Sequence, residues 1–182
     1  MALPLHELAA LGTATCWAMT GLIASDAIKA LGAFHFNLIR QVFVSLLLVG
    51  VVTLTGGWQG LSLAQLAILA LSGVLGILLG DTLNFAAIGR LGPRRAGAIF
   101  ALNAPMAAVL GWLFLAEALL GIGVAALGVA LAVLGRPGQN AHRLEAVRGR
   151  LLLGALLELG AALGQAAGSL IARPVMAAGL DP

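Results

Sequence analysis

The sequence has little charge: only 9% of its 182 residues are Asp, Glu, Lys or Arg, whereas 61% are hydrophobic. A soluble domain typically carries about 25% charged residues, so this shortage excludes an ordinary soluble fold. The few charges are clustered, and the intervals between them are long enough for a helix to cross about 30 Å of hydrocarbon at about 1.5 Å per residue. We therefore predict an all-α, polytopic integral membrane protein.

Cysteine is almost absent. Cys16 is the one cysteine, which excludes an intramolecular disulfide and gives no support to a zinc site. The sequence also lacks the motifs G-x-S-x-G and H-E-x-x-H, and it has no loop that groups Ser, His, Asp and Arg around a phosphate. We accordingly expect no metal, no cofactor and no enzymatic activity.

The positive charge is not arranged as in a nucleic-acid-binding protein. The formal net charge is +3 at pH 7, but the Arg residues lie in short links between apolar runs, where they favour contact with anionic lipid headgroups. The N-terminal segment MALPLHEL lacks a basic region before the first apolar run, which argues against a cleaved signal peptide. We expect membrane lipids, and not nucleic acid, as partners.

Apolar runs separated by short polar links predict six transmembrane helices. Between Arg40 and Asp81 there is no charge at all, and the Gly-rich stretch TGGWQGLS divides this run into two spans. The most polar link, residues 136–150, is the best candidate for an internal boundary. The predicted spans are residues 8–25, 34–55, 63–88, 96–116, 118–135 and 151–172.

The basic residues indicate an orientation in the membrane. Nine of the ten Lys and Arg residues lie in or close to the links after the first, third and fifth spans, and only Arg173 lies near the other side. By the positive-inside rule these links face the cytoplasm and the N-terminus faces outward. The nine residues are Lys29, Arg40, Arg90, Arg94, Arg95, Arg136, Arg143, Arg148 and Arg150.

A faint internal repeat relates the first span to the sixth. A shift of 147 residues sets Ala14, Gly21, Ala30 and Gly32 against Ala161, Gly168, Ala177 and Gly179. Because five is an odd number of spans, a copy of the first span that follows them crosses the membrane in the opposite direction. This is the inverted-repeat plan of many secondary transporters. We thus predict a first five-helix repeat over residues 1–135, a basic polar linker over 136–150, and the first helix of a second, incomplete repeat over 151–182.

The segment GDTLNFAAIGRLGPRRAGAIFALNAPMAAVLGWLFLAEAL, residues 80–119, resembles the EamA-type branch of the drug/metabolite transporter superfamily. In this comparison Arg40 corresponds to the Arg that opens the second helix, Pro105 to the proline of helix four, and Glu117 to the acidic residue that closes it. Gly128 and Gly135 correspond to the paired glycines of helix five. The resemblance covers nearly the whole chain.

The resemblance implies a fold of ten helices in two inverted five-helix halves, an activity of exporting or exchanging small metabolites, and a bacterial inner-membrane location. It also implies a cytoplasmic N-terminus, opposite to the orientation that the basic residues indicate. Because the chain corresponds to one half plus one helix, we expect either a truncated ten-helix protein, or a homodimer or partner chain that supplies the missing helices. The substrate is expected to be a small molecule.

Two carboxylates at membrane depth are candidates for a substrate or proton pathway. Asp81 lies in the third span with Asn84 one turn further on the same face. The alternative for Asp81 is a structural pairing with Arg90, Arg94 or Arg95, which occupy the nearby link. In the sixth span Glu158 and Gln165 lie two turns apart on nearly the same face. A helix-to-helix hydrogen bond is the alternative for Glu158, which is otherwise the strongest candidate.

Two further residues complete the candidate set. Trp17 lies in the middle of the first span, where it can line a pocket or simply pack against lipid. Pro105 removes a backbone hydrogen bond in the fourth span and predicts a kink. We interpret the chain as a secondary-active exporter or exchanger of metabolites or drugs, with a non-transporting membrane scaffold or a membrane-embedded lipid-modifying enzyme as alternatives.

Overall fold

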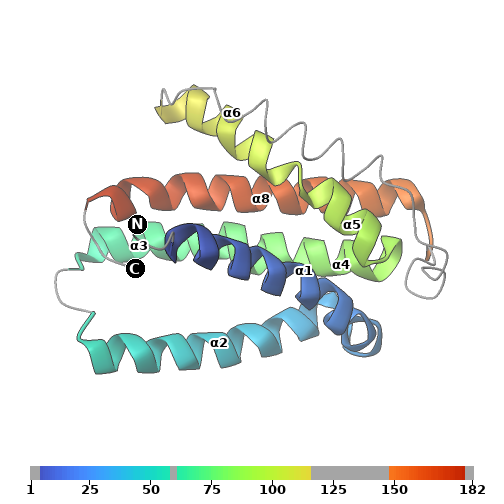
Figure 1. The fold of residues 1–182 in the computed structure, drawn as a ribbon, viewed down its shortest axis with the longest axis horizontal. Coiled ribbons are helices and arrows are strands. Elements are labelled where there is room, and N and C mark those ends of the chain that lie inside the picture. Colours follow the sequence, from blue (N-terminus) through green and yellow to red (C-terminus); the bar gives the residue numbers. More distant parts are fainter. Residues whose placement is uncertain (1–4, 58–60, 116–147, 179–182) are drawn as a thin grey trace.

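The computed structural model describes residues 5–57, 61–115 and 148–178, and within these ranges every regular element is a helix. The all-α prediction is therefore confirmed for the described part of the chain. The elements are α1 (Leu5–Leu31), α2 (Ala33–Thr55), α3 (Leu63–Gly73), the π-helix η1 (Val74–Gly80), α4 (Asp81–Leu91), α5 (Pro93–Phe100), α6 (Asn103–Leu115) and α8 (Leu151–Ala177). Figure 1 shows α2, the α3–α4 stretch and α8 running along the long axis of the molecule, with α1, α5 and α6 inclined to them.

Four helical stretches of the described residues are long and apolar enough to cross a membrane: Ala33–Thr55, Leu63–Leu91, Pro93–Phe114 and Leu151–Ala177. They contain the predicted second, third, fourth and sixth spans almost entirely. The predicted first span lies within α1, which is 27 residues long but is not among the four. The predicted fifth span, together with Glu117, Gly128 and Gly135, lies outside the described residues. A multi-pass membrane protein is thus supported, whereas the count of six spans is not confirmed.

The third span is one continuous helical rod built from three elements. It begins at a capping box, in which the Ser62 hydroxyl accepts a hydrogen bond from the Gln65 backbone N–H at 3.2 Å and the Gln65 side chain accepts one from the Ser62 N–H at 2.8 Å. Its middle is the π-helix η1, and its last part is α4. A π-helical turn widens the hydrogen-bonding register, and such turns are frequent at functional sites.

The sixth predicted span, α8, lies directly against this rod and runs in the opposite direction to α1 (Figure 1). Glycines make the approach possible, because a Cβ added to Gly168 would lie 2.8 Å from the Gly76 Cα. The Ser72 hydroxyl also donates a hydrogen bond to the Gly168 carbonyl at 2.8 Å. Small residues that let two backbones meet are the usual basis of helix packing in membranes. At the crossing of η1 and α8, the two backbones therefore approach each other closely.

The fourth span is interrupted close to Pro105. Helix α5 ends at Phe100, and α6 begins at Asn103 after a turn in which the Leu102 N–H donates to the Ile99 carbonyl at 3.0 Å. Proline has no N–H to give to the carbonyl four residues earlier, here Ala101, and its ring crowds that carbonyl. The position of the break agrees with this local effect of Pro105.

Two tight turns and the start of α8 bring five helix ends together at one end of the bundle. Gly32 and Gly92 adopt positive φ angles of 79° and 82°, which glycine tolerates and other residues rarely do. The turns connect α1 to α2 and α4 to α5, and α8 begins at the same end (Figure 1). This end, called the basic end below, carries Lys29, Arg90, Arg94, Arg95, Arg148 and Arg150.

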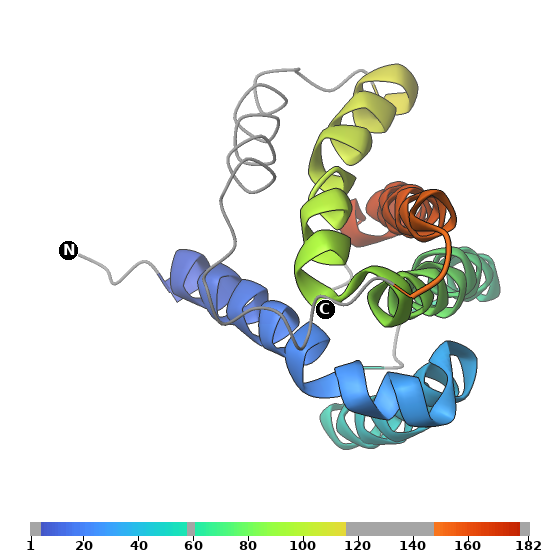
Figure 2. The same cartoon turned by 90° about the vertical axis from the view of Figure 1, so that its right-hand side faces the viewer.

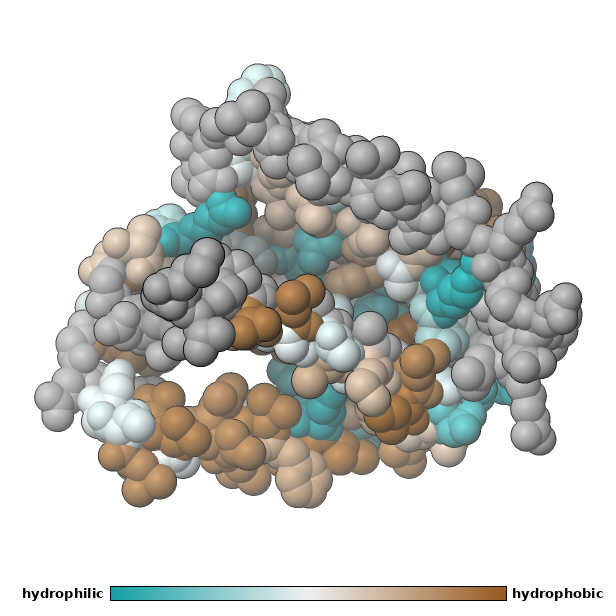
Figure 3. All heavy atoms as spheres, in the orientation of Figure 1, coloured by the Kyte–Doolittle hydropathy of each residue, from teal (hydrophilic) through white to brown (hydrophobic). Residues whose placement is uncertain are grey.

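The side chains of the bundle divide between a small core and an apolar exterior. Viewed from the basic end, α8 and the third span lie side by side, with α1 and α2 on one side of them and α5 on another (Figure 2). The core joins α1, α4 and α5 through Ala24, Ile28, Phe85, Ala87, Ile88 and Ala96. By contrast, α2 presents large hydrophobic side chains outward (Figure 3), among them Phe43 at 71% and Leu54 at 89% exposure. An outward apolar surface of this kind suits contact with lipid.

Candidate substrate site

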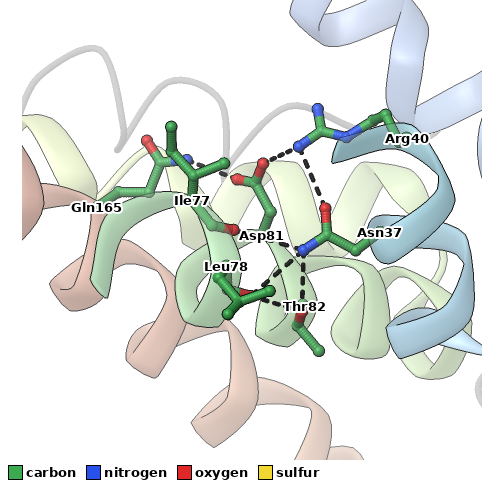
Figure 4. A network of polar contacts seen from close by, with 7 residues as sticks. All are labelled: Asn37, Arg40, Ile77, Leu78, Asp81, Thr82 and Gln165. Carbon is green, nitrogen blue, oxygen red and sulfur yellow. Dashed lines mark hydrogen bonds and ion pairs between the residues drawn. The ribbon is translucent and has the colours of Figure 1, made fainter. Parts of the chain in front are cut away.

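The first residue of α4, Asp81, is the centre of a polar network inside the bundle (Figure 4). It is 2% exposed, and its two carboxylate oxygens face different helices. Arg40 of α2 forms an ion pair and hydrogen bond with Oδ2. From α8, the side-chain amide of Gln165 donates a hydrogen bond to Oδ1 at 2.7 Å. The carboxylate therefore joins α2 and α8 to the third span.

Asn37 extends the network along α2. The Arg40 guanidinium donates to Asn37 Oδ1 at 3.3 Å, and Asn37 Nδ2 donates to Thr82 Oγ1 at 2.9 Å and to the Leu78 carbonyl at 3.2 Å. Asn37 is fully buried. The Leu78 carbonyl belongs to η1, and it also accepts the Thr82 hydroxyl at 2.6 Å. The π-helix thus offers backbone acceptors that hold Asn37, and Asn37 in turn holds the Arg40 guanidinium in place.

An aromatic ring supports the guanidinium from another direction. The Arg40 Cζ lies 5.1 Å from the centroid of the Phe85 ring, within the range of a cation–π contact. Phe36 packs edge-on against Phe85, with the ring centroids 4.9 Å apart. Within the described part of the chain, Arg40 Nε is buried without a hydrogen-bond partner. The pair of Arg40 and Asp81 is therefore positioned on both sides, by Asn37 and by Phe85.

The ion pair lies on the wall of a cavity of about 700 Å³. Arg40, Asp81 and Gln165 contribute the polar part of this wall, and Trp17 contributes an aromatic face. Figure 3 shows the molecule hollowed above the hydrophobic row of α2. The remaining lining residues are Thr13, Gln41, Val44 and Ile77. We refer to this space as the central cavity.

A second cavity, of about 470 Å³, lies toward the basic end between α1, α4 and α5. Trp17 lines it as well, and its ring meets that of Phe100 at a centroid distance of 6.1 Å. Asn84, which is buried, and Arg94 are among the polar residues of this wall. Because the rest of the wall is mostly apolar, we call this space the aromatic cavity.

The structure brings some of the predicted site residues together and separates others. Trp17, Asp81 and Gln165 line the central cavity, whereas Asn84 lines the aromatic cavity together with Trp17. Pro105 lies in α6 and lines neither cavity. Glu158 lines neither of them, although it is fully buried.

The predicted structural partners of Asp81 are wrong. Its cationic partner is Arg40, which comes from a neighbouring helix and not from the link after the third span. Arg90 lies nine residues further along α4, about 13.5 Å at 1.5 Å per residue, which is beyond the reach of a side-chain contact. Arg40 had been counted among the residues that set membrane orientation, but its position inside the bundle removes it from that count.

Asn37 and Thr82 were not predicted as site residues. A signal for Asn37 was present in FNLIRQ, where Asn37 and Arg40 are three residues apart and share a helix face. Thr82 had no such signal, because the hydroxyl of a helical threonine can bond to the carbonyl four residues earlier without any partner on another helix.

Glu158 occupies a different kind of environment from Asp81. Its side chain is fully buried in α8, and among the described residues neither carboxylate oxygen has a hydrogen-bond partner. Buried polar groups are normally hydrogen-bonded, so an unpartnered buried acid calls for an explanation. The helix-to-helix hydrogen bond considered for Glu158 is not present among the described residues.

Residues 5–135 match the model of the EamA-like transporter family. The chain belongs to this family. It is a multi-pass integral membrane protein and a membrane transporter of the drug/metabolite type. Of the network residues, Asn37, Arg40, Asp81 and Thr82 lie inside the matched range, and Gln165 lies beyond it. No curated protein and no solved structure matches the chain.

Proposed function

We propose that this EamA-family protein is a secondary-active carrier that exports or exchanges small metabolites or drugs across a bacterial inner membrane, and that its substrate binds in the central cavity beside Asp81 and Arg40. The observation that carries the proposal is an ion pair within the membrane span that lines a cavity large enough for a small molecule. Ion pairs that face a cavity at membrane depth are typical of substrate and ion pathways.

The chemistry of the cavity wall suits a substrate with both polar and apolar parts. Asp81 offers carboxylate oxygens to a hydrogen-bond donor or cation, and Arg40 offers guanidinium N–H groups to an acceptor or anion. Trp17 adds a flat apolar surface. A substrate can therefore replace the contact between Asp81 and Arg40 with its own hydrogen bonds to each of them. Neither charge is then left without a partner in the membrane.

Glu158 is proposed to carry the coupling proton. It is buried in the same helix as Gln165, seven residues or about 10.5 Å away along the axis and on nearly the same face. Among the described residues it lacks a hydrogen-bond partner, unlike Asp81. A carboxyl group that takes up and releases a proton during a transport cycle needs no permanent cationic partner.

The experiment is an efflux screen with purified protein in liposomes. The liposomes are loaded with a mixture of amino acids, nucleosides, sugars and organic cations, and mass spectrometry measures what remains inside over time. We expect selective loss of at least one compound from liposomes with the native protein, and a much slower loss with Asp81→Asn. Asp26→Asn, a change of an exposed acid at the end of α1, is the matched control and is expected to keep the native rate. Equal retention in native and protein-free liposomes would contradict transport of these classes.

A further inference from the structure

A third hollow lies on the opposite side of the central cavity from the aromatic one. It has a volume of about 530 Å³ and lies between the third span and α8. Ser72 and Ser169 are among its polar lining residues, and Met176 lines it near the end of α8. We call it the α3–α8 groove.

The three hollows share residues only at two places among the described ones. Trp17 lines both the aromatic cavity and the central cavity. Ile77 and Gln165 line both the central cavity and the α3–α8 groove. At each of these places, one or two residues belong to the walls of both neighbouring spaces.

The hollows follow one another along the bundle. The aromatic cavity includes Pro93 and Arg94, which lie at the basic end. The groove includes residues of α3 and of the last turns of α8, which lie at the opposite end (Figure 1). The central cavity lies between them, so the series leads from one end of the membrane-spanning helices to the other.

We propose that Trp17 and the pair Ile77–Gln165 are the two movable partitions of the transport path, with Trp17 separating the site from the basic end and Gln165 from the other end. The proposal rests on the proposed function, because it takes the central cavity as the substrate site. It adds the route by which that site communicates with each side of the membrane.

The packing around Gln165 favours a side-chain movement over a separation of helices. Gly164 and Gly168, on either side of it in sequence, approach the backbone of the third span so closely that added Cβ atoms would lie 3.1 Å from the Leu75 carbonyl oxygen and 2.8 Å from the Gly76 Cα. Gln165 itself is held to the third span by one hydrogen bond of its side chain, to Asp81 Oδ1. The backbone contact is thus fixed, while the amide can rotate away.

This hydrogen bond also links the partition to the site. A substrate donor group that takes over Oδ1 of Asp81 removes the partner that holds the Gln165 amide. Arg40 remains bound to the other oxygen, Oδ2. Occupation of the cavity therefore favours release of Gln165 and access to the α3–α8 groove.

The test measures the accessibility of single thiols in sealed membrane vesicles. Cys16→Ala removes the one native cysteine, and a thiol is then placed at Thr20 in the aromatic cavity, Gln41 in the central cavity or Ser169 in the groove. A membrane-impermeant cationic thiosulfonate is added from one side or the other. The thiols at Thr20 and Ser169 are expected to react from opposite sides, which defines the two sides for the central thiol.

Removing a partition should then open the central thiol to one side only. Gln165→Ala is expected to raise the labelling rate of Gln41→Cys about tenfold from the side that labels Ser169→Cys, as a tenfold larger open population requires. Trp17→Ala is expected to raise the labelling rate of Gln41→Cys from the side that labels Thr20→Cys. Leu163→Ala and Met19→Ala, which shorten exposed side chains on the same two helices, are the matched controls and should leave the rate unchanged.

The proposal is overturned if either partition variant raises the rate no more than its control does, or raises it from the opposite side. Gln165→Glu keeps the size of the side chain but replaces the amide donor with a carboxylate, which cannot donate to Asp81 when ionised. This variant tests the same partition if Gln165→Ala does not fold. Because labelling needs no transported substrate, a failure here is distinct from a failure of the efflux screen.

Discussion

The side-chain amide of Gln165 donates a hydrogen bond of 2.7 Å to Asp81 across 84 residues of sequence. This contact joins the region that matches the transporter family, which ends at residue 135, to a helix that follows it. The acid in the family region is therefore bound on one side by Arg40 from its own region and on the other by α8. The candidate site depends on both parts of the chain.

The ion pair should be necessary for stability as well as for transport. Arg40→Gln leaves the Asp81 carboxylate buried without its cation, and breaking a buried pair in this way costs about 3 kcal/mol or more of unfolding free energy. Unfolding in detergent, followed by circular dichroism, measures the loss. The double variant Arg40→Gln/Asp81→Asn should recover much of it, because no uncompensated charge remains. Lys29→Gln, in the surface pair with exposed Asp26, should cost no more than about 1 kcal/mol.

The glycine crossing should be sensitive to a single methyl group. Gly168→Ala places a Cβ 2.8 Å from the Gly76 Cα and 2.9 Å from the Ser72 carbonyl oxygen, so α8 has to move away from η1. Overpacking of this kind costs about 1 to 3 kcal/mol. At Gly73, where an added Cβ meets nothing within 4 Å, the same substitution should be neutral or stabilise by up to about 1 kcal/mol. Equal unfolding midpoints for the two variants would contradict the close approach.

Much of the helical plan could be predicted from the sequence because charge marks the ends of helices in a membrane. The predicted third span, residues 63–88, and the sixth, residues 151–172, agree with the stretches Leu63–Leu91 and Leu151–Ala177. The π-helix within the third span could not be predicted, since its sequence VLGILLG has the same composition as an α-helical span. Two carbonyls of this π-helix, those of Ile77 and Leu78, accept hydrogen bonds from Asn37.

The site was predicted in part, for a related reason. A carboxylate at membrane depth is conspicuous in a chain with 9% charged residues, so Asp81 and Glu158 were named from sequence. The partner of Asp81 was not, because proximity along one helix favoured Arg90 whereas the contact depends on how α2 crosses the third span. Charge alone groups Arg40 with the basic residues of the links, but the fold places it beside Phe85 and Asp81.

Asn37 should be the residue that sets the position of Arg40. Asn37→Leu keeps the approximate volume but removes the donor to η1 and the acceptor for the guanidinium. Leaving buried groups of the Arg40 network without partners costs about 1 to 3 kcal/mol, measured as a shift of the unfolding midpoint. Efflux should also slow, since Arg40 is no longer held at the cavity wall. Thr15→Val removes an exposed hydroxyl that bonds only within its own helix, and it should change neither measurement.

Glu158→Gln separates coupling from substrate binding. The substitution keeps the size of the buried side chain and removes its ability to take up a proton, while the contacts of Asp81 with Arg40 and Gln165 stay in place. We expect efflux of a compound found in the screen to lose its acceleration by an imposed pH gradient, whereas exchange of the same compound at equal pH continues. Asp26→Asn should keep the acceleration. If the gradient still drives efflux through Glu158→Gln at the native rate, the coupling proton is carried elsewhere, and Asp81 becomes the acid to test because it is the other buried carboxylate among the described residues.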